Sequence, residues 1–309
     1  MKAAQIKKYG DASVVEIVEV SRPSVREDQV LVEMTASSLN PFDTALREGY
    51  VPGPLPMTLG GDVAGVVIEV GSDVTTLTTG DHVYGQAYAI AGNSGAFAEY
   101  VASVASQIAK APSNLSLQEA AALPLVGASA LQGITEHIKL QANQKVFIHG
   151  GTGGIGSIAI QIAKHIGAYV ATTATGEGLQ LATQLGADEV IDYKAKDFAE
   201  QLHDFDAVFD TVGGDDFTKS FGILKKGGIA VTMIAQPDED KAKALGVTVV
   251  RQMTDVTADQ LDQLRPLIED GVVTARIGKV FPLEDIREAF AARESHSVSG
   301  KIVIEIKAS

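Results

Sequence analysis

The chain has 309 residues, a formal net charge of −14, 45% hydrophobic residues and no cysteine. This length exceeds what one hydrophobic core usually supports, so two domains are expected. The negative charge argues against nucleic acid or an anionic membrane surface as a partner, because both need clustered Lys and Arg. A chain without cysteine has no disulfide, thiolate zinc site, iron–sulfur cluster or cysteine nucleophile.

The start of the chain does not resemble a signal peptide. Its first 20 residues alternate polar and apolar side chains like a strand and lack the apolar core of a signal peptide. No apolar run reaches the roughly 18 residues of a membrane span. We therefore expect a cytoplasmic protein.

Residues 1 to 120 predict a mostly β domain. Short alternating or apolar runs lie at 14–20, 29–37, 62–71 and 95–103, with Pro and Gly clusters between them. Ser116 and Glu119 have the spacing of a capping box, which predicts the start of a helix.

After this point strands alternate with helices. Strands are predicted at 145–150, 168–175, 188–193, 205–214, 227–236 and 246–253, and helices include 154–166, 197–203, 215–224 and 257–269. This alternation is typical of an α/β fold with a doubly wound parallel sheet. Beyond Arg276 the pattern returns to strand, helix and strand, so we expect one domain from 1–120 with 275–309 and a second from 121–274.

The most specific motif is HGGTGGIG at 149–156, which follows an apolar strand and opens an amphipathic helix. Gly151, Gly153 and Gly156 satisfy G-x-G-x-x-G, in which the glycines permit the tight turn, the approach of a pyrophosphate and close helix–strand packing. The helix N-terminus would offer free N–H groups to the phosphates. A glycine-rich turn with packing duties alone is the alternative. The candidate phosphate-binding residues are Gly151, Thr152, Gly153, Gly154, Ile155 and Gly156.

The next strand bears on the choice of cofactor. An NAD site normally ends this strand with Asp or Glu, which binds the ribose 2′-hydroxyl. Here the strand ends in Thr172, Thr173, Ala174 and Thr175, whose small hydroxyl side chains leave room for a 2′-phosphate. NADP is therefore favoured, although the nearby Glu177 carboxylate would repel a phosphate.

Motifs along the whole chain resemble a known family. These are SLNPFDTALREG (38–49), PLPMTLGGDVAGVVIEVG (54–71), GAFAEYV (95–101), AALPLVGASALQGI (121–134), LGADEVIDY (185–193) and SGKIVIEI (299–306). Together with the glycine loop they look like the medium-chain dehydrogenase/reductases, in the zinc-lacking quinone oxidoreductase branch that includes zeta-crystallin. The resemblance implies a GroES-like catalytic domain built from both chain ends, a Rossmann domain between them, and a cleft where nicotinamide meets substrate.

Zinc-dependent members of the family place a Cys and a His in the two N-terminal motifs. The corresponding stretches here carry Asn40 to Asp43 and Gly61-Asp62, without Cys. A catalytic zinc normally needs three protein ligands, so no metal is expected.

The resemblance also implies cofactor contacts. It assigns Thr175 and Tyr193 to the 2′-phosphate, Ser129 to the region of the nicotinamide ribose, and Met233 with Ile234 to the side of the nicotinamide. Tyr193 could equally pack against the sheet.

Three residues in or beside the N-terminal motif are candidate catalytic residues. The Asn40 amide and the Tyr50 hydroxyl could donate hydrogen bonds to the oxygen that gains charge during reduction. Asp43 belongs to the same motif. Each has a structural alternative: Asn40 as a turn cap before proline, Tyr50 as a loop aromatic over the cleft, and Asp43 as a helix N-cap.

The expected function is hydride transfer from NADPH to a quinone or an α,β-unsaturated carbonyl compound, without a metal. The alternative is a non-catalytic NADPH-binding protein, either crystallin-like or RNA-binding, and the net charge disfavours RNA. The partners are then a small-molecule substrate and a second copy of the chain. We expect a homodimer paired through the apolar strand at 246–253.

Overall fold

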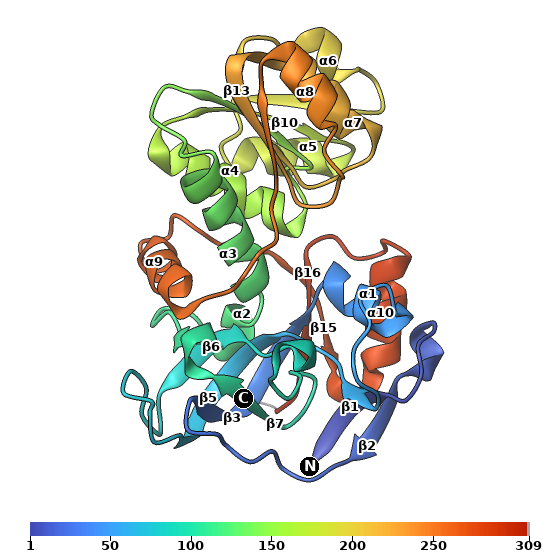
Figure 1. The fold of residues 1–309 in the computed structure, drawn as a ribbon, viewed down its shortest axis with the longest axis vertical. Coiled ribbons are helices and arrows are strands. Elements are labelled where there is room, and N and C mark those ends of the chain that lie inside the picture. The colour runs from blue at the N-terminus through green and yellow to red at the C-terminus, as the bar shows by residue number, and fades with distance from the viewer. Residues whose placement is uncertain (308–309) are drawn as a thin grey trace. The chain divides into compact units, whose positions relative to one another are not determined.

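The computed structural model describes residues 1–307, and the chain divides into two compact units (Figure 1). Unit 1 comprises Met1–Ala128, Val256–Glu269 and Ala275–Ser309, and unit 2 comprises Ser129–Asp255 and Asp270–Thr274. Both chain ends therefore belong to unit 1, in keeping with the strand pattern that returns after Arg276. Over residues 1–307, no helix combines the length and the apolar character needed to cross a bilayer.

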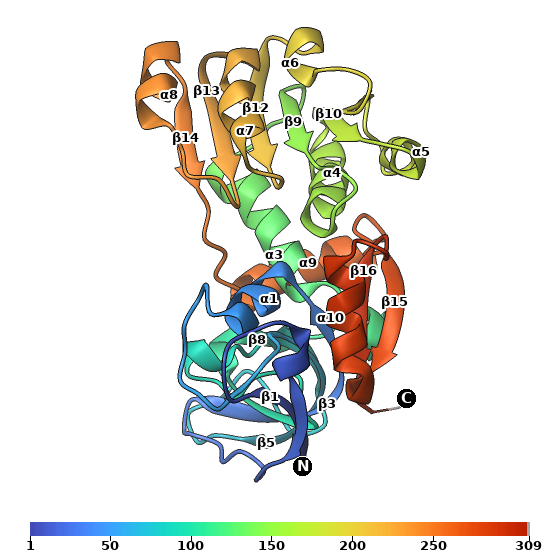
Figure 2. The same cartoon turned by 90° about the vertical axis from the view of Figure 1, so that its right-hand side faces the viewer.

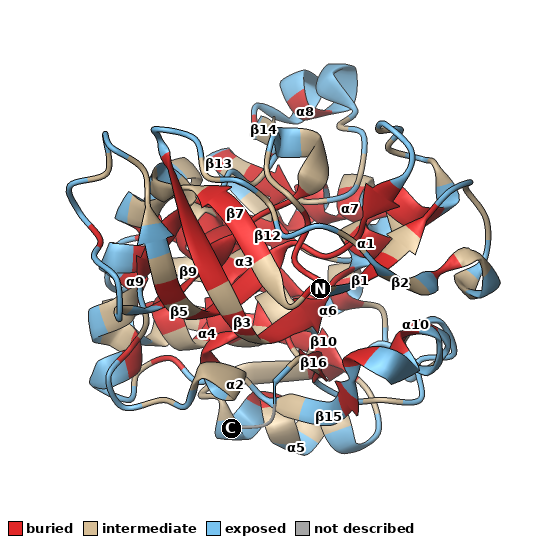
Figure 3. Ribbon diagram, turned by 90° about the horizontal axis from the view of Figure 1, so that it is seen from below, coloured by how far each residue is buried: buried red, intermediate tan, exposed pale blue. Residues whose placement is uncertain are grey.

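Unit 1 is built on a seven-stranded sheet in the order β15-β16-β3-β5-β6-β8, with β7 paired to β3. The strands are β3 (Gln29–Leu39), β5 (Asp62–Val70), β6 (His82–Gln86), β7 (Tyr100–Val104), β8 (Ile108–Lys110), β15 (Ile277–Pro282) and β16 (Lys301–Glu305). A smaller sheet contains β2 (Glu16–Glu19), β1 (Lys2–Ile6) and β4 (Met57–Thr58). The long central strand β3 is almost wholly buried, as its red colour in Figure 3 shows.

The helices of unit 1 are α1 (Pro41–Glu48), α2 (Leu117–Ala120), α9 (Ala258–Glu269) and α10 (Ile286–Glu294), and α3 (Pro124–Leu131) contains the boundary between the units. We expected the helix at 257–269 in the Rossmann domain, but α9 belongs to unit 1. Its buried face packs on β8. The Tyr84 hydroxyl donates to the Leu261 carbonyl at 2.7 Å, and Leu264 lies against Gly127.

Unit 2 contains a six-stranded parallel sheet in the order β11-β10-β9-β12-β13-β14 (Figure 2). Its strands are β9 (Lys145–His149), β10 (Tyr169–Ala174), β11 (Glu189–Asp192), β12 (Phe205–Asp210), β13 (Leu224–Thr232) and β14 (Thr248–Arg251). This is the doubly wound Rossmann order, in which the direction of winding reverses between β9 and β12. The predicted α/β fold class, a GroES-like β domain with a Rossmann domain, is confirmed.

The helices of unit 2 are α4 (Gly154–Ile166), α5 (Glu177–Gln184), α6 (Phe198–Gln201), α7 (Asp215–Lys219) and α8 (Glu239–Leu245). Phe147 of β9 packs with Phe198, Phe217 and Phe221 in a buried core on one face of the sheet. The helix expected at 215–224 ends at Lys219 and continues as a 3-10 turn, Ser220–Ile223. Helix α8 was not predicted, because its sequence is short and largely polar.

Candidate functional site

The glycine loop joins the end of β9 to the start of α4. Gly150 has φ +84°, a conformation that favours glycine, and the Gly153 N–H donates to the Gly150 carbonyl at 3.1 Å. Two hydroxyls of β10 fix the loop: Thr173 Oγ1 accepts from Gly150 N at 3.1 Å, and Thr172 Oγ1 accepts from Gly151 N at 3.0 Å. The loop is therefore held by the neighbouring strand.

The glycines of the motif differ in what an added Cβ would meet. A Cβ on Gly156 would lie 2.2 Å from the Gly150 carbonyl oxygen, which matches its predicted role in close packing. A Cβ on Gly151 would lie 2.1 Å from Thr172 Oγ1, so this glycine makes room for the strand hydroxyl, and Gly150 supplies the left-handed turn. A Cβ on Gly153 would meet only the Gly150 oxygen, at an ordinary 3.4 Å. Among the described residues, a Cβ at position 153 is therefore tolerated.

The N-terminus of α4 is open to an anion. Gly153 occupies the N-cap position, and no side chain caps the helix. The first N–H groups of a helix have no intrahelical partner and carry a partial positive charge. Thr152, Gly154 and Ile155 are half-buried and Gly153 is exposed, so this backbone borders solvent. The arrangement can bind a phosphate through backbone N–H groups.

The ends of β10 and β11 lie side by side, with Ala174 paired to Asp192. The Tyr193 N–H donates to the Ala174 carbonyl at 3.3 Å, which places Tyr193 beside Thr175. Thr175 is half-buried, and Tyr193 and Glu177 are exposed. Tyr193 therefore does not pack into the sheet core, and its assignment to a 2′-phosphate stays a prediction.

The remaining predicted cofactor residues lie near other strand ends of unit 2. Met233 and Ile234 directly follow β13, and 57% of the Ile234 surface is exposed. Ser129 is fully buried, its hydroxyl lies 2.8 Å from Thr254 Oγ1, and its carbonyl accepts from Gln252 Nε2 at 3.0 Å. Its predicted place near the nicotinamide ribose is not tested by these contacts.

In unit 1, a buried polar network surrounds Asn40. Its amide Nδ2 donates to Asp62 Oδ2 at 2.7 Å, and its Oδ1 accepts from Lys301 Nζ at 2.5 Å. Asp62 also accepts from the Ser38 hydroxyl at 2.5 Å and from Leu125 N at 3.0 Å. Burial lowers the pKa of the Lys301 ammonium, and the carboxylates of Asp62 and Asp43 oppose this shift. Both the nitrogen and the oxygen of the Asn40 side-chain amide thus have hydrogen-bond partners within the protein.

Asp43 is fully buried at the third position of α1. Its Oδ2 accepts from Asn40 N at 2.7 Å, so Asn40 is the N-cap residue and the suggestion of Asp43 as N-cap is wrong. The reason is that α1 begins at Pro41, where proline is well tolerated. The Tyr88 hydroxyl is buried near this carboxylate, and burial together with the charge of Asp43 raises the pKa of Tyr88. Burial raises the pKa of the Asp43 carboxyl to about 7.

Tyr50, two residues after α1, is 81% exposed.

Sequence comparisons match both parts of the chain. Residues 26–113 match the alcohol dehydrogenase GroES-like domain, and residues 185–304 match the zinc-binding dehydrogenase family. A 2-methylene-furan-3-one reductase of Solanum lycopersicum is 37% identical, over 98% of this chain and 79% of the relative. An NADPH-dependent alkenal/one oxidoreductase, chloroplastic, of Arabidopsis thaliana is 34% identical with the same coverage.

The fold comparison agrees. The quinone oxidoreductase from Coxiella burnetii superposes with a TM-score of 0.89 at 32% identity, over 99% of each chain. This chain belongs to the medium-chain dehydrogenase/reductases, in their quinone oxidoreductase branch. The family resemblance predicted from the motifs is confirmed.

The name of the matched dehydrogenase family implies zinc, but the residues of this medium-chain dehydrogenase/reductase do not fit it. The chain has no cysteine, and residues 1–307 contain no group of three or more His, Asp or Glu side chains that could hold a metal ion. Asp62 accepts three hydrogen bonds, and the Lys301 ammonium lies 3.8 Å from its Oδ2. A cation at this carboxylate would have to displace those donors and the ammonium group.

Several residues that organise the medium-chain dehydrogenase/reductase site escaped sequence reasoning. Thr172 and Thr173 were considered only in relation to a 2′-phosphate, although two hydroxyls on the strand beside a glycine loop are suited to hold the loop. Lys301 was seen as a strand residue. His149 was noted only as the first residue of the glycine motif; it is buried, and its Nδ1 lies 2.9 Å from Asp210 Oδ1.

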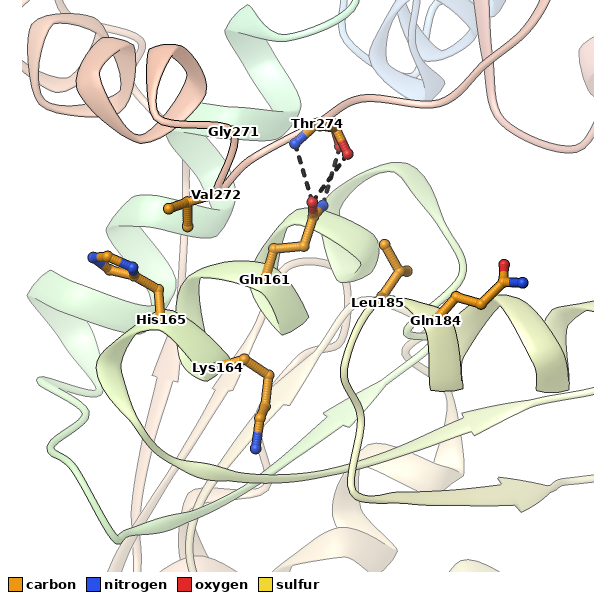
Figure 4. Close-up of a pocket in the computed structure, with 8 residues that line it drawn as sticks. All are labelled: Gln161, Lys164, His165, Gln184, Leu185, Gly271, Val272 and Thr274. Atoms are coloured by element: carbon orange, nitrogen blue, oxygen red, sulfur yellow. Dashed lines mark hydrogen bonds between the residues drawn. The ribbon is translucent and has the colours of Figure 1, made fainter.

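A surface pocket of about 440 Å³ lies near the C-terminal end of α4 (Figure 4). It is lined by Gln161, Lys164, His165, Gln184, Leu185, Gly271, Val272 and Thr274. The Gln161 side-chain amide is hydrogen-bonded to the backbone of Thr274. Its Nε2 donates to the Thr274 carbonyl and its Oε1 accepts from the Thr274 N–H, both at 3.0 Å. The glycine loop lies at the other end of the helix, so this pocket is not the phosphate site.

Proposed function

We propose that this protein reduces quinones or α,β-unsaturated carbonyl compounds with NADPH and without a metal. The observation that carries the proposal is the open glycine loop, which presents uncapped helix N–H groups at the carboxyl end of β9, beside the switch point of the sheet. The names of the relatives, a furanone reductase and an NADPH-dependent alkenal/one oxidoreductase, support the acceptor class and the cofactor. Bound NADPH supplies the hydride, and the chain supplies binding and orientation.

The preference for NADPH is proposed from the end of β10. Thr175 offers a hydroxyl there, and Tyr193 is held beside it by the bond to Ala174. Lys194 and Lys196 follow on the same turn and are exposed, so they can supply positive charge that β10 itself lacks. This positive charge would offset the carboxylate of Glu177.

Tyr50 is our candidate donor to the acceptor oxygen, because its side chain is exposed. Asn40 is fully buried, and its amide nitrogen donates to Asp62 Oδ2 at 2.7 Å and to the Ser38 carbonyl at 3.4 Å. We therefore propose that it acts mainly by shaping the polar network around Asp62, together with Asp43. A quinone or enone oxygen that gains charge is stabilised by such donors.

The test is NADPH oxidation with 1,4-benzoquinone and with 3-buten-2-one, followed by the loss of reduced-nicotinamide absorbance. We expect turnover with at least one acceptor, and a lower kcat/KM with NADH. Binding of NADPH without turnover of either acceptor would contradict the proposal and favour a non-catalytic NADPH-binding protein.

We also propose a homodimer and a cytoplasmic location. The dimer is supported by β14, which pairs only with β13 among the described residues and so leaves one edge of the sheet available. Light scattering on the purified chain should give twice the monomer mass of 32.3 kDa, and a monomer would contradict the dimer. Cell fractionation tests the location.

A further inference from the structure

A buried His–Asp pair spans the switch point of the parallel sheet. His149 is the last residue of β9, Asp210 is the last residue of β12, and the two are paired in register. His149 Nδ1 lies 2.9 Å from Asp210 Oδ1, and both side chains are buried. Ligands of doubly wound sheets bind outside the strand ends at this point.

The Asp210 carboxylate holds the turn that follows β12. It accepts from the Val212 N–H at 3.2 Å and from the Gly213 N–H at 3.0 and 3.1 Å. Burial raises its pKa, but the hydrogen bonds from His149, Thr232 and Gly213 outweigh burial, so the pKa of Asp210 is lowered. The group is therefore an ionised acceptor.

The same carboxylate holds the turn that follows β13, through Thr232. The Thr232 hydroxyl donates to Asp210 Oδ2 at 2.7 Å. Its oxygen accepts from Ile234 N at 3.2 Å and Ala235 N at 3.0 Å. Two turns after adjacent strands are thus fixed by one buried carboxylate and one hydroxyl.

The two turns touch and expose apolar side chains. A Cβ on Gly213 would lie 3.2 Å from Ile234 Cγ2, and Val212 and Ile234 are 52% and 57% exposed. Val212 and Ile234 therefore form an apolar surface on backbone that hydrogen bonds to Asp210 and Thr232 hold in place. Burial of a carboxylate is a poor route to stability alone, which is consistent with a role in fixing the geometry of these turns.

The place of this surface points to its ligand. If the glycine loop binds the pyrophosphate and the end of β10 binds the adenosine ribose, the other half of a dinucleotide extends across the switch point over β12 and β13. That half carries the reactive ring.

We propose that Asp210 and Thr232 are positioning residues that fix the turns at 211–213 and 233–235 as the support for the nicotinamide ring. This inference rests on the proposed NADPH-dependent function. Neither residue needs to touch the cofactor, because each acts through backbone N–H groups. Loss of either residue should impair hydride transfer more than it weakens binding of the adenosine end of the cofactor.

The test compares matched substitutions. Thr232→Val removes the hydroxyl but keeps the shape, and Thr232→Ser restores the hydroxyl. Asp210→Asn removes the charge, and Asp206→Asn is its control, because Asp206 lies at the other end of β12, where it binds Lys145 N and Lys225. For each variant kcat, the Kd of NADPH and the Kd of adenosine 2′,5′-bisphosphate are measured.

We expect kcat to fall about 10- to 100-fold in Thr232→Val and Asp210→Asn, as for a reacting group displaced by a fraction of an ångström to one ångström. Thr232→Ser and Asp206→Asn should keep the kcat of the parent protein. The Kd of adenosine 2′,5′-bisphosphate should not change in any variant. If Asp210→Asn does not fold, the comparison of Thr232→Val with Thr232→Ser tests the inference.

Two results would overturn the inference. One is an unchanged kcat in Thr232→Val, and the other is a parallel loss of adenosine 2′,5′-bisphosphate binding, which indicates general damage to the unit. Failure of the proposed function looks different, because the parent protein itself would then not oxidise NADPH with either acceptor, whether or not it binds the bisphosphate.

Discussion

Gly153 offers the sharpest test of the phosphate site, because the described residues leave room for a side-chain methyl group there. A Cβ there would meet only the Gly150 oxygen at 3.4 Å, and its φ of −73° and ψ of 171° suit alanine. Gly153→Ala should therefore change the free energy of unfolding by no more than about 0.5 kcal/mol.

The same methyl group would lie where phosphate oxygens approach the loop. Loss of one charge-assisted hydrogen bond removes about 1.5–3 kcal/mol, which corresponds to a Kd for NADPH about 10- to 150-fold higher. Isothermal titration calorimetry measures this Kd, and thermal unfolding measures stability.

Two other glycines supply the controls. Gly156→Ala places Cβ 2.2 Å from the Gly150 oxygen, so the backbone must shift, and the overpacking should lower stability by about 1–3 kcal/mol as well as weaken binding. Gly222 has no atom within 4 Å of its Cβ position, and Gly222→Ala should alter neither quantity. If Gly153→Ala keeps the parent Kd, the phosphates do not lie on this loop and the assignment is wrong.

Three further substitutions test other parts of the site. Thr175→Asp should lower kcat/KM for NADPH relative to NADH by at least about tenfold, through repulsion of the 2′-phosphate; an unchanged ratio would remove Thr175 from that subsite. Tyr50→Phe should leave the melting temperature unchanged and lower kcat about 100- to 1000-fold, as for loss of one donor; an unaffected kcat would exclude the hydroxyl. The folded-state pKa of Asp43 is about 7, above the roughly 3.9 of an unfolded Asp, so its proton is held in the folded state between these values. Stability should therefore fall as pH rises from about 4 to about 7, by up to about 1.4 kcal/mol per pH unit. Denaturant titrations of Asp43→Asn should show a flatter pH dependence and, above pH 7, a more stable protein; an identical dependence would contradict the burial argument.

Much of the fold was accessible from sequence because its signals are local. The alternation of strands and helices and the glycines after β9 follow directly from hydrophobic periodicity and turn chemistry. Helix α9 was assigned to the wrong unit, since its amphipathic pattern says that one face is buried but not against which sheet. Helix α8 has little apolar periodicity and was missed for that reason.

The site was predicted less completely, because its networks join distant parts of the chain. Asn40 was identified from its motif, but its partner Lys301 lies 261 residues away, and no spacing rule connects them. The bond between His149 and Asp210 depends on the order of strands in the sheet. The two side chains meet only because β9 and β12 are neighbours in the sheet, which is a property of the topology.

The proposed reaction is hydride transfer from NADPH to an acceptor carbon in a protein that does not use a metal. The decisive experiment uses NADPH carrying deuterium at nicotinamide C4, incubated with 3-buten-2-one and protein treated with a chelator, with elemental analysis of the same sample. We expect deuterium at the β-carbon of the reduced product and less than stoichiometric zinc. A product without deuterium from either face of C4, or activity that is lost with the chelator and restored by zinc, would contradict it.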